Sequence, residues 1–266
     1  QVQTSVAQQV NLVNRAGLSL NFWDGSAGAG YNNGVADGGA GTWRVGSPGD
    51  GWTDMNGSLN AAWKQDQFAI FGGTGGTVTV DKSGGTVSIG GAQFMVDGYV
   101  VQGDSLNIDN AGTVVRVGDG TAAGAAMTAT INSAITGTGG LSKEDLGTLV
   151  LNGANTYTGG TLVKAGVLQG NTTSLQGSIV NDANVTFDQS TNGTYAGTMS
   201  GTGSLRKIGA GELLLTAANS YQGGTLVDAG TVNAGVSGAL GSGDVFVTGG
   251  AGLIFSSQAD AGNLKI

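Results

Sequence analysis

The stretch GTGGLSKEDLGTLVLNGANTYTGGTLVKAGVL, residues 137–168, decides the fold of this chain. A second copy, GTGSLRKIGAGELLLTAANSYQGGTLVDAGTV, occupies residues 201–232. The copies align without a gap, Gly137 with Gly201 through Leu168 with Val232, and 18 of the 32 aligned positions are identical. A long internal repeat is typical of folds that stack similar supersecondary units. The positions that we expect to be structural are Gly137, Leu141, Leu149, Leu151, Asn155, Tyr157, Gly159 and Gly160 in the first copy and Gly201, Leu205, Leu213, Leu215, Asn219, Tyr221, Gly223 and Gly224 in the second.

The composition indicates an ordered all-β protein. Glycine accounts for 53 of 266 residues, yet charged residues are only 11% and apolar residues 39%, which is not the composition of a disordered chain. Short β-rich segments of three to five residues follow one another from Gln67 onward, separated by Gly, Asn and Asp. Strands this short fit a sandwich, a barrel or a parallel β-helix.

The repeat favours the parallel β-helix, a single-stranded solenoid of about 20 residues per coil. On that basis the offset between the two copies corresponds to about three coils, and the whole chain to about twelve. Leucine, valine and isoleucine side chains are expected to point inward. Glycines at the corners supply the positive φ of tight turns, and stacked Asn155 and Asn219 are expected to bond the backbone of neighbouring coils.

Two regions are expected. Residues 1–66 form an N-terminal capping region with the first coils, and residues 67–266 form the β-helix that carries both repeats. All four tryptophans lie in the first region, at positions 23, 43, 52 and 63. An aromatic-rich segment covers the open end of a solenoid well, and this interpretation outweighs a sugar-stacking platform.

The charge balance excludes nucleic acid as a partner. The net charge is −8, and the ten Lys and Arg residues are scattered singly, whereas nucleic acids and anionic membranes require basic patches. The absence of cysteine excludes disulfides and thiolate metal sites. No run of 18 apolar residues occurs, so no segment is long and apolar enough to be a membrane-spanning helix.

Both copies of the repeat resemble the passenger-associated transport repeat of autotransporter (type V secretion) proteins of Gram-negative bacteria. The shared pattern is G-x-G-x-L-x-K-x-x-x-G-x-L-x-L-x-x-x-N-x-Y-x-G-G-T-x-V-x-x-G. The first copy departs from it at Lys143–Gly147, where the family usually has K-x-G-x-G. The resemblance implies a right-handed parallel β-helix, exported through the periplasm and outer membrane and displayed on the cell surface or secreted. It also implies an N-terminal signal and a C-terminal outer-membrane barrel in the same precursor, of which this chain is expected to be a fragment.

The sequence was searched for catalytic and metal-binding patterns. There is no histidine, no G-x-S-x-G, no H-E-x-x-H and no phosphate-binding G-x-x-x-x-G-K-[ST], so we predict no catalytic residue, no cofactor and no metal. A polysaccharide lyase or hydrolase is the enzymatic alternative, with Asp97, Asp104, Asp109 and Asp119 beside Arg116. We prefer to interpret these aspartates as solvated turn residues.

Further polar and aromatic residues have similar alternatives. Calcium binding by Asp24, Asp37, Asp50 and Asp54 is weighed against ordinary loop roles, and the loop roles are favoured because no calcium-loop spacing occurs. The equivalent lysines at positions 143 and 207 are interpreted as side chains that extend to solvent beside a strand rather than as ligand contacts. The two repeat tyrosines fit corner packing and a ligand platform equally well.

The function that follows is structural and adhesive rather than enzymatic. A stiff β-helix displays broad polar faces far from the membrane. The expected partners are a host-cell surface protein or glycan, or a second copy of the chain in self-association between cells. A secreted ligand for a host receptor is a further alternative that the sequence does not separate from these.

Overall fold

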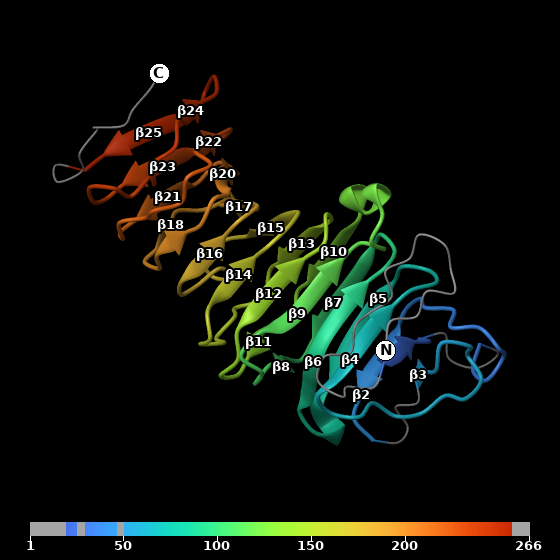
Figure 1. Ribbon diagram of the computed structural model, residues 1–266. Coiled ribbons are helices and arrows are strands. Elements are labelled where there is room, and N and C mark those ends of the chain that lie inside the picture. Colours follow the sequence, from blue (N-terminus) through green and yellow to red (C-terminus); the bar gives the residue numbers. More distant parts are fainter. Residues whose placement is uncertain (1–19, 26–29, 47–50, 257–266) are drawn as a thin grey trace.

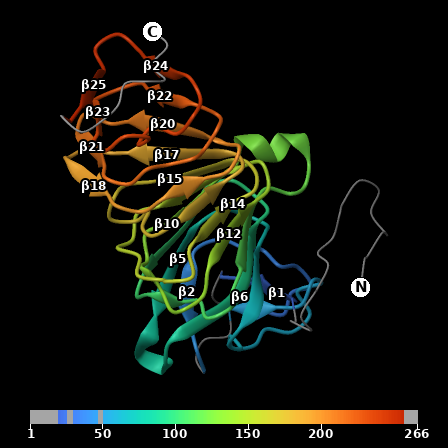
Figure 2. The ribbon, with the colours of Figure 1, turned by 60° about the vertical axis from the view of Figure 1, so that its left-hand side comes forward.

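The computed structural model describes residues 20–25, 30–46 and 51–256, and it is a parallel β-solenoid of about nine turns (Figure 1). This confirms the predicted fold class. The described residues also include two short 3-10 helices, η1 (Lys82–Gly84) and η2 (Ala122–Ala126). Helix η2 is the green turn that projects from the side of the solenoid in Figures 1 and 2. Within these ranges, no helix has the length and apolar character needed to cross a membrane.

Three sheets form the faces of the solenoid, which we call the first, second and third face. The first face contains β1 (Leu20–Trp23), β3 (Trp52–Thr53), β4 (Gln67–Phe71), β6 (Val87–Phe94), β9 (Thr113–Val117), β12 (Leu141–Glu144), β14 (Thr161–Val163), β16 (Ile179–Asn181) and β19 (Met199–Ser200). Strands β8 (Leu106–Asn107) and β11 (Ile135–Thr136) form a separate short ladder on the N-terminal end of β6. The second contains β2 (Gly41–Arg44), β5 (Thr77–Asp81), β7 (Tyr99–Gly103), β10 (Thr128–Ile131), β13 (Thr148–Leu151), β15 (Val167–Gly170), β17 (Asn184–Asp188), β20 (Ser204–Ile208), β22 (Thr225–Val227) and β24 (Val245–Val247). The third contains β18 (Gly193–Tyr195), β21 (Glu212–Leu215), β23 (Thr231–Ala234) and β25 (Gly252–Phe255).

Strands β1 and β3 pair antiparallel at the N-terminal end of the first face. The other neighbouring strands of a face come from successive coils and run parallel. In Figure 2 the strands β5, β10, β15, β17, β20 and β22 of the second face lie one above another. Thr148 of β13 pairs with Val167 of β15, and Leu205 of β20 pairs with Thr225 of β22, which gives about 20 residues per coil. Nearer the N-terminus the coils are longer, since Leu20 pairs with Phe68, more than two such coil lengths further along the chain. These longer coils explain why the prediction of about twelve coils is wrong.

Inward-facing side chains form continuous columns along the solenoid. On the second face Leu149, Leu168, Val185 and Leu205 stack in register, and each is at most 1% exposed. Successive side chains of a strand point to opposite sides, so every second residue of these short strands enters the core. The core is therefore a stack of apolar layers that runs through the described residues.

The two copies of the repeat do not occupy the same faces. On the first face, three coils lead from Leu141 through Thr161 and Ile179 to Met199. Leu205, the counterpart of Leu141, comes after Met199 and lies on the second face. The offset between the copies therefore equals three coils plus one further face. The prediction of about three coils is close, and the second copy is displaced by one face around the axis.

An aspartate at position 149 would test the inward column. Leu149→Asp places an unpaired carboxylate in a site that is 0% exposed, and we expect the free energy of unfolding to fall by more than about 4 kcal/mol. Val150→Asp changes the adjacent residue on the outward side and should cost less than about 1 kcal/mol. Urea denaturation followed by circular dichroism measures both values, and equal losses would contradict the assignment of the column.

Candidate functional site

The aspartates of the enzymatic alternative bind backbone turns. Asp97 Oδ1 accepts a hydrogen bond from Thr128 N at 2.7 Å, and Asp119 Oδ1 accepts from Thr121 N at 2.9 Å and from its hydroxyl at 2.7 Å. Thr121 and Thr128 flank the projecting turn that contains η2. The two carboxylates therefore hold the two ends of one surface loop.

The other two aspartates have the same kind of role. Asp104 Oδ2 accepts from Lys82 N at 2.9 Å in the preceding coil. Asp109 accepts from Asn107 Nδ2 at 2.6 Å and from Thr138 N at 3.1 Å. The hydrogen bond from Asn107 is the main reason that the pKa of Asp109 is lowered. A lowered pKa suits the structural role of Asp109 as an anion and not that of a general acid.

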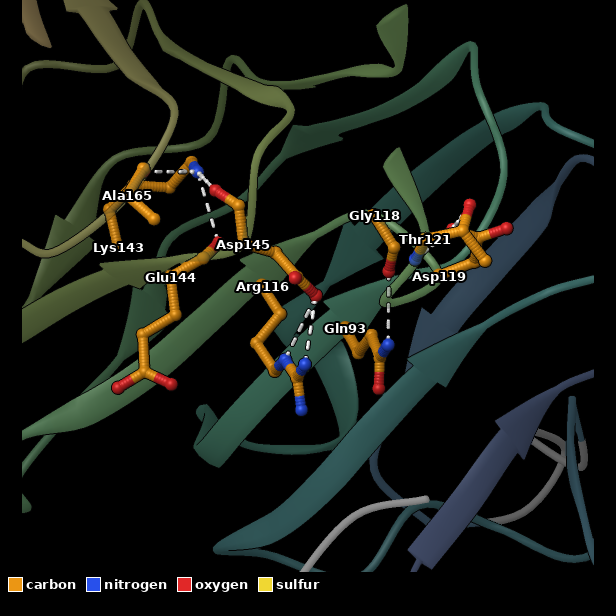
Figure 3. Close-up of polar contacts among 9 residues, drawn as sticks. All are labelled: Gln93, Arg116, Gly118, Asp119, Thr121, Lys143, Glu144, Asp145 and Ala165. Atoms are coloured by element: carbon orange, nitrogen blue, oxygen red, sulfur yellow. Dashed lines mark hydrogen bonds and ion pairs between the residues drawn. The ribbon is translucent and has the colours of Figure 1, made fainter. Parts of the chain in front are cut away.

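Arg116 pairs with a residue that the sequence did not single out. Its Nε and one terminal nitrogen both contact Asp145 Oδ2, at 3.1 and 2.9 Å (Figure 3). Asp145 follows β12, in the coil after β9, which carries Arg116. The arginine thus bridges two coils. Its ion-pair partner, Asp145, is not one of the four aspartates of the enzymatic alternative. The described contacts give no shared catalytic arrangement of Arg116 with Asp97, Asp104 and Asp119.

The candidate calcium ligands also stabilise loops. Asp24 is buried and accepts from Asp37 N at 3.1 Å and from Asn60 Nδ2 at 2.9 Å. Asp54 Oδ1 accepts from two backbone amides of its own turn. Asp50 lies outside the described residues. No group of three or more metal-ligating side chains occurs among the residues that the structure does describe.

The four tryptophans lie together near the N-terminal end of the solenoid. Each is at most 3% exposed, and their ring centroids lie 4.5–5.1 Å from those of tryptophan neighbours. Trp23 Nε1 donates to Gly39 O, and Trp63 Nε1 donates to Ser88 O. A sugar-stacking platform requires exposed ring faces, so this burial favours packing of the solenoid end. The boundary at residue 66 stays a prediction.

The expectation that Lys143 and Lys207 extend to solvent is wrong. Both side chains are 0% exposed. Lys143 Nζ donates to the carbonyl oxygens of Glu144, Asp145 and Ala165 at 3.0, 2.7 and 3.0 Å (Figure 3). Lys143 pairs with Val115 and Val163 in the inward column, so its side chain passes through the core and caps the carbonyls at the corner. Burial lowers the pKa of Lys143 to about 8, against the opposing influence of Asp145 and Glu144.

The asparagines of the repeat connect three successive coils. Asn155 Oδ1 accepts from Ile135 N at 2.7 Å in the preceding coil, and its Nδ2 donates to Ser174 O at 2.8 Å in the following coil. Asn219 makes the equivalent bonds, accepting from Met199 N and donating to Ala239 O. An amide side chain with one acceptor and two donors suits this position between coils.

The tyrosines of the repeat are internal. Tyr221 is 0% exposed, and its hydroxyl bonds Thr225 Oγ1 at 2.5 Å. Tyr157 is half-buried and makes the same contact with Thr161 Oγ1 at 2.7 Å. Burial raises the pKa of both phenols. These contacts favour corner packing over a ligand platform.

Three exposed apolar side chains that the sequence did not single out lie on two adjacent loops: Val35, Met55 and Leu59, which we call together the N-terminal patch. These side chains are 53%, 54% and 69% exposed. Their two loops are tied together because Asn32 N donates to Asn60 Oδ1 at 2.8 Å and Asn60 N donates to Asn32 Oδ1 at 2.7 Å. No local pattern distinguishes these residues from the surrounding polar loops.

Removing one asparagine tests the links between coils. Asn155→Ala leaves a buried amide and a buried carbonyl without partners, so we expect the free energy of unfolding to fall by about 2–4 kcal/mol. Asn152→Ala is the control: the exposed side chain of Asn152 donates to that of Asn132, and its removal should cost less than about 0.5 kcal/mol. Urea denaturation compares the two; a loss at position 155 no larger than that at 152 would contradict the role.

The buried lysines predict a pH dependence of stability. Burial depresses the pKa of both, to about 8 for Lys143, from an ordinary value of 10.5. Above pH 8 the unfolded chain therefore binds more protons than the folded chain, and stability should rise between pH 8 and 9.5. Above about pH 10 the unfolded chain's tyrosines ionise and oppose this rise. The free energy of unfolding, measured by urea denaturation at each pH, should lose most of this rise in the Lys143→Met, Lys207→Met variant. If its dependence on pH is the same in the variant and the parent, the burial of the two lysines is contradicted.

Comparison with known proteins identifies the repeats. The passenger-associated-transport-repeat family model matches residues 141–169 and 205–234. The adhesin BmaC autotransporter of Brucella suis biovar 1 (strain 1330) is 43% identical over 272 residues. That match covers 90% of this chain and 8% of the relative, so the chain spans a small part of the relative's length. No solved structure matches. This chain therefore contains two passenger-associated transport repeats of the autotransporter type, both built into one parallel β-solenoid.

Proposed function

We propose that this chain is an adhesive, non-enzymatic β-solenoid segment of a passenger displayed on the cell surface of a Gram-negative bacterium. The observation that carries the proposal is the 43% identity to an autotransporter adhesin over 90% of the chain. The route is export through the periplasm and outer membrane, with a C-terminal outer-membrane barrel in the same precursor. The segment forms part of the stiff stalk and also presents contacts from its sides.

The architecture supports a contact role. Parallel coils fix the outward side chains of each face at a regular spacing of about 4.8 Å, so that many weak contacts act together. The polar outer surface and net charge of −8 keep the stalk soluble. The aspartates of the enzymatic alternative hold turns, and this favours a binding role over catalysis.

The N-terminal patch is the part of the described surface that we assign to the contact. Its two loops lie outside the repeats, and among the residues that the structure describes Leu59 is the most exposed large apolar side chain. Apolar side chains exposed on tied loops are typical of protein contacts. The partner is a host-cell surface protein or glycan; a second copy of the chain is the alternative, and the assay below separates them.

Substitutions in the N-terminal patch test the proposal. Beads coated with the chain should bind host cells saturably, and Met55→Asp with Leu59→Asp should weaken binding at least about fivefold without changing the melting temperature. Val180→Asp is the matched control, since Val180 is 42% exposed on the outer side of β16.

Three outcomes separate the alternatives. Clustering of the beads without binding to cells assigns self-association. Equal effects of the patch and control substitutions would remove the patch from the contact. Absence of both binding and clustering by the folded chain would contradict an adhesive role for this segment.

A further inference from the structure

Three backbone carbonyl oxygens, which we call the lysine cage, hold the buried lysine at equivalent positions in both transport repeats. Lys207 Nζ makes a further, longer contact with Gln189 O of the preceding coil, at 3.5 Å. Lys207 Nζ donates to the carbonyl oxygens of Ile208, Gly209 and Ala229 at 2.8, 2.7 and 3.2 Å. These acceptors stand at the same places after the lysine as the three acceptors of Lys143: the next residue, the one after it, and the alanine before the corner glycine of the following coil. The two cages lie on different faces of the solenoid, so a position on one particular face does not explain them. The sequence of the repeat itself builds the cage.

Two of the three carbonyls belong to the lysine's own corner, and the third belongs to the coil that follows. A glycine next to the third carbonyl allows the approach. Gly166 has φ +68°, and a Cβ there would lie 2.4 Å from Gly147 O and 2.5 Å from Asp145 O. Gly230 has φ +65°, and its Cβ would lie 2.4 Å from Gly211 O and 2.5 Å from Gly209 O. Only glycine tolerates both the close contact and this backbone conformation.

Four of the positions that are identical between the copies lie in the cage or at its corner. These are Lys143 and Lys207, Gly147 and Gly211, Ala165 and Ala229, and Gly166 and Gly230. The backbone conformation at the middle of the corner is also the same in both copies: Asp145 has φ +67°, and its counterpart Gly209 has φ +81°. Asp145 tolerates the left-handed conformation, and its carboxylate gains Arg116 as a partner.

Net stability alone does not account for a buried lysine. The neighbours in the same columns are apolar: Val115 and Val163 flank Lys143, while Phe187 and Val227 flank Lys207. Glu144 and Asp145 direct their carboxylates to Lys164 and Arg116, so the ammonium is held by carbonyl oxygens. Replacing a buried charge by an apolar side chain is often neutral or stabilising, and the best-attested reason to retain one is to specify register.

We infer that each transport repeat contains an internal cation site, occupied by its own lysine ammonium and completed by a backbone carbonyl of the next coil, which couples docking of that coil to the repeat. Because Ala165 and Ala229 supply the third ligand, a following coil out of register leaves a buried ammonium with an incomplete set of acceptors. The lysine is thus a positioning residue for the coil on its C-terminal side. This inference stands independently of the adhesive role.

A double-mutant cycle on the full chain tests the coupling. Native-state hydrogen exchange is measured at the amides of Lys164 and Val167, which bond Lys143 O and Gly147 O across the same corner. Gly166→Ala should increase the opening constant of these amides in the parent, because the added Cβ pushes the following coil away. In the Lys143→Met background, Gly166→Ala should also increase the opening constant of these amides, but the fold increase should be at least about five times smaller than in the parent. The reason is that no ammonium remains for the displaced carbonyl to bind.

Matched pairs complete the test. Gly230→Ala with Lys143→Met, which belong to different repeats, should show independent effects at Asp228 and Thr231. Lys207→Met and Gly230→Ala form the equivalent coupled pair in the second repeat, measured at the same two amides. This pair provides the test if a variant at position 143 or 166 fails to fold. Lys164→Met removes a half-exposed lysine beside the first cage and should leave the effect of Gly166→Ala unchanged. An equal effect of the glycine substitution with and without the caged lysine, in both repeats, would overturn the inference.

Discussion

The structure depends on close stacking of backbone on backbone. Parallel strands of successive coils lie about 4.8 Å apart, so each coil must satisfy the peptide groups of the next. Glycines at corners permit this approach where a Cβ would meet a carbonyl oxygen, as at Gly166 and Gly230. The columns of buried leucines and valines then supply the apolar core. Asn155, Asn219 and the two lysines bring polar atoms inward at corners, where they bond backbone groups of neighbouring coils.

This constraint separates the scaffold from the contact surface. The shared leucines of the strands, the asparagines and the lysines point inward or connect coils, and therefore they stabilise the solenoid without selecting a partner. Asp97 and Asp119 likewise serve the coil geometry, because they hold the ends of a projecting loop. The surface available for recognition consists of the outward residues and of the loops that lengthen the early coils. Changes in these outward residues and loops therefore leave the corners that build the transport repeats intact.

Much of the architecture could be predicted because its signals are local. Alternation in short strands such as Thr148–Leu151 shows which side chains face the core, and the glycines between strands mark the corners. The fold class and the identity of the repeats are confirmed. The coil count was too high because the insertions between Leu20 and Phe68 lengthen a coil without changing the strand pattern. The role of Asn155 was accessible from sequence since an amide in a repeated turn has few other uses.

The sequence by itself determined the all-β solenoid, the approximate coil length and the inward and outward sides of each strand, because all three follow from spacing along the chain. Only the tertiary structure decided that the second repeat is displaced by one face, that Arg116 joins Asp145, and that Lys143 and Lys207 are buried. Each of these depends on which residue of one coil lies above which residue of the next. This register between coils depends on the length of every turn that lies between the paired strands. A lysine beside a strand has the same local pattern whether its ammonium reaches water or three carbonyls, and the following coil makes the difference.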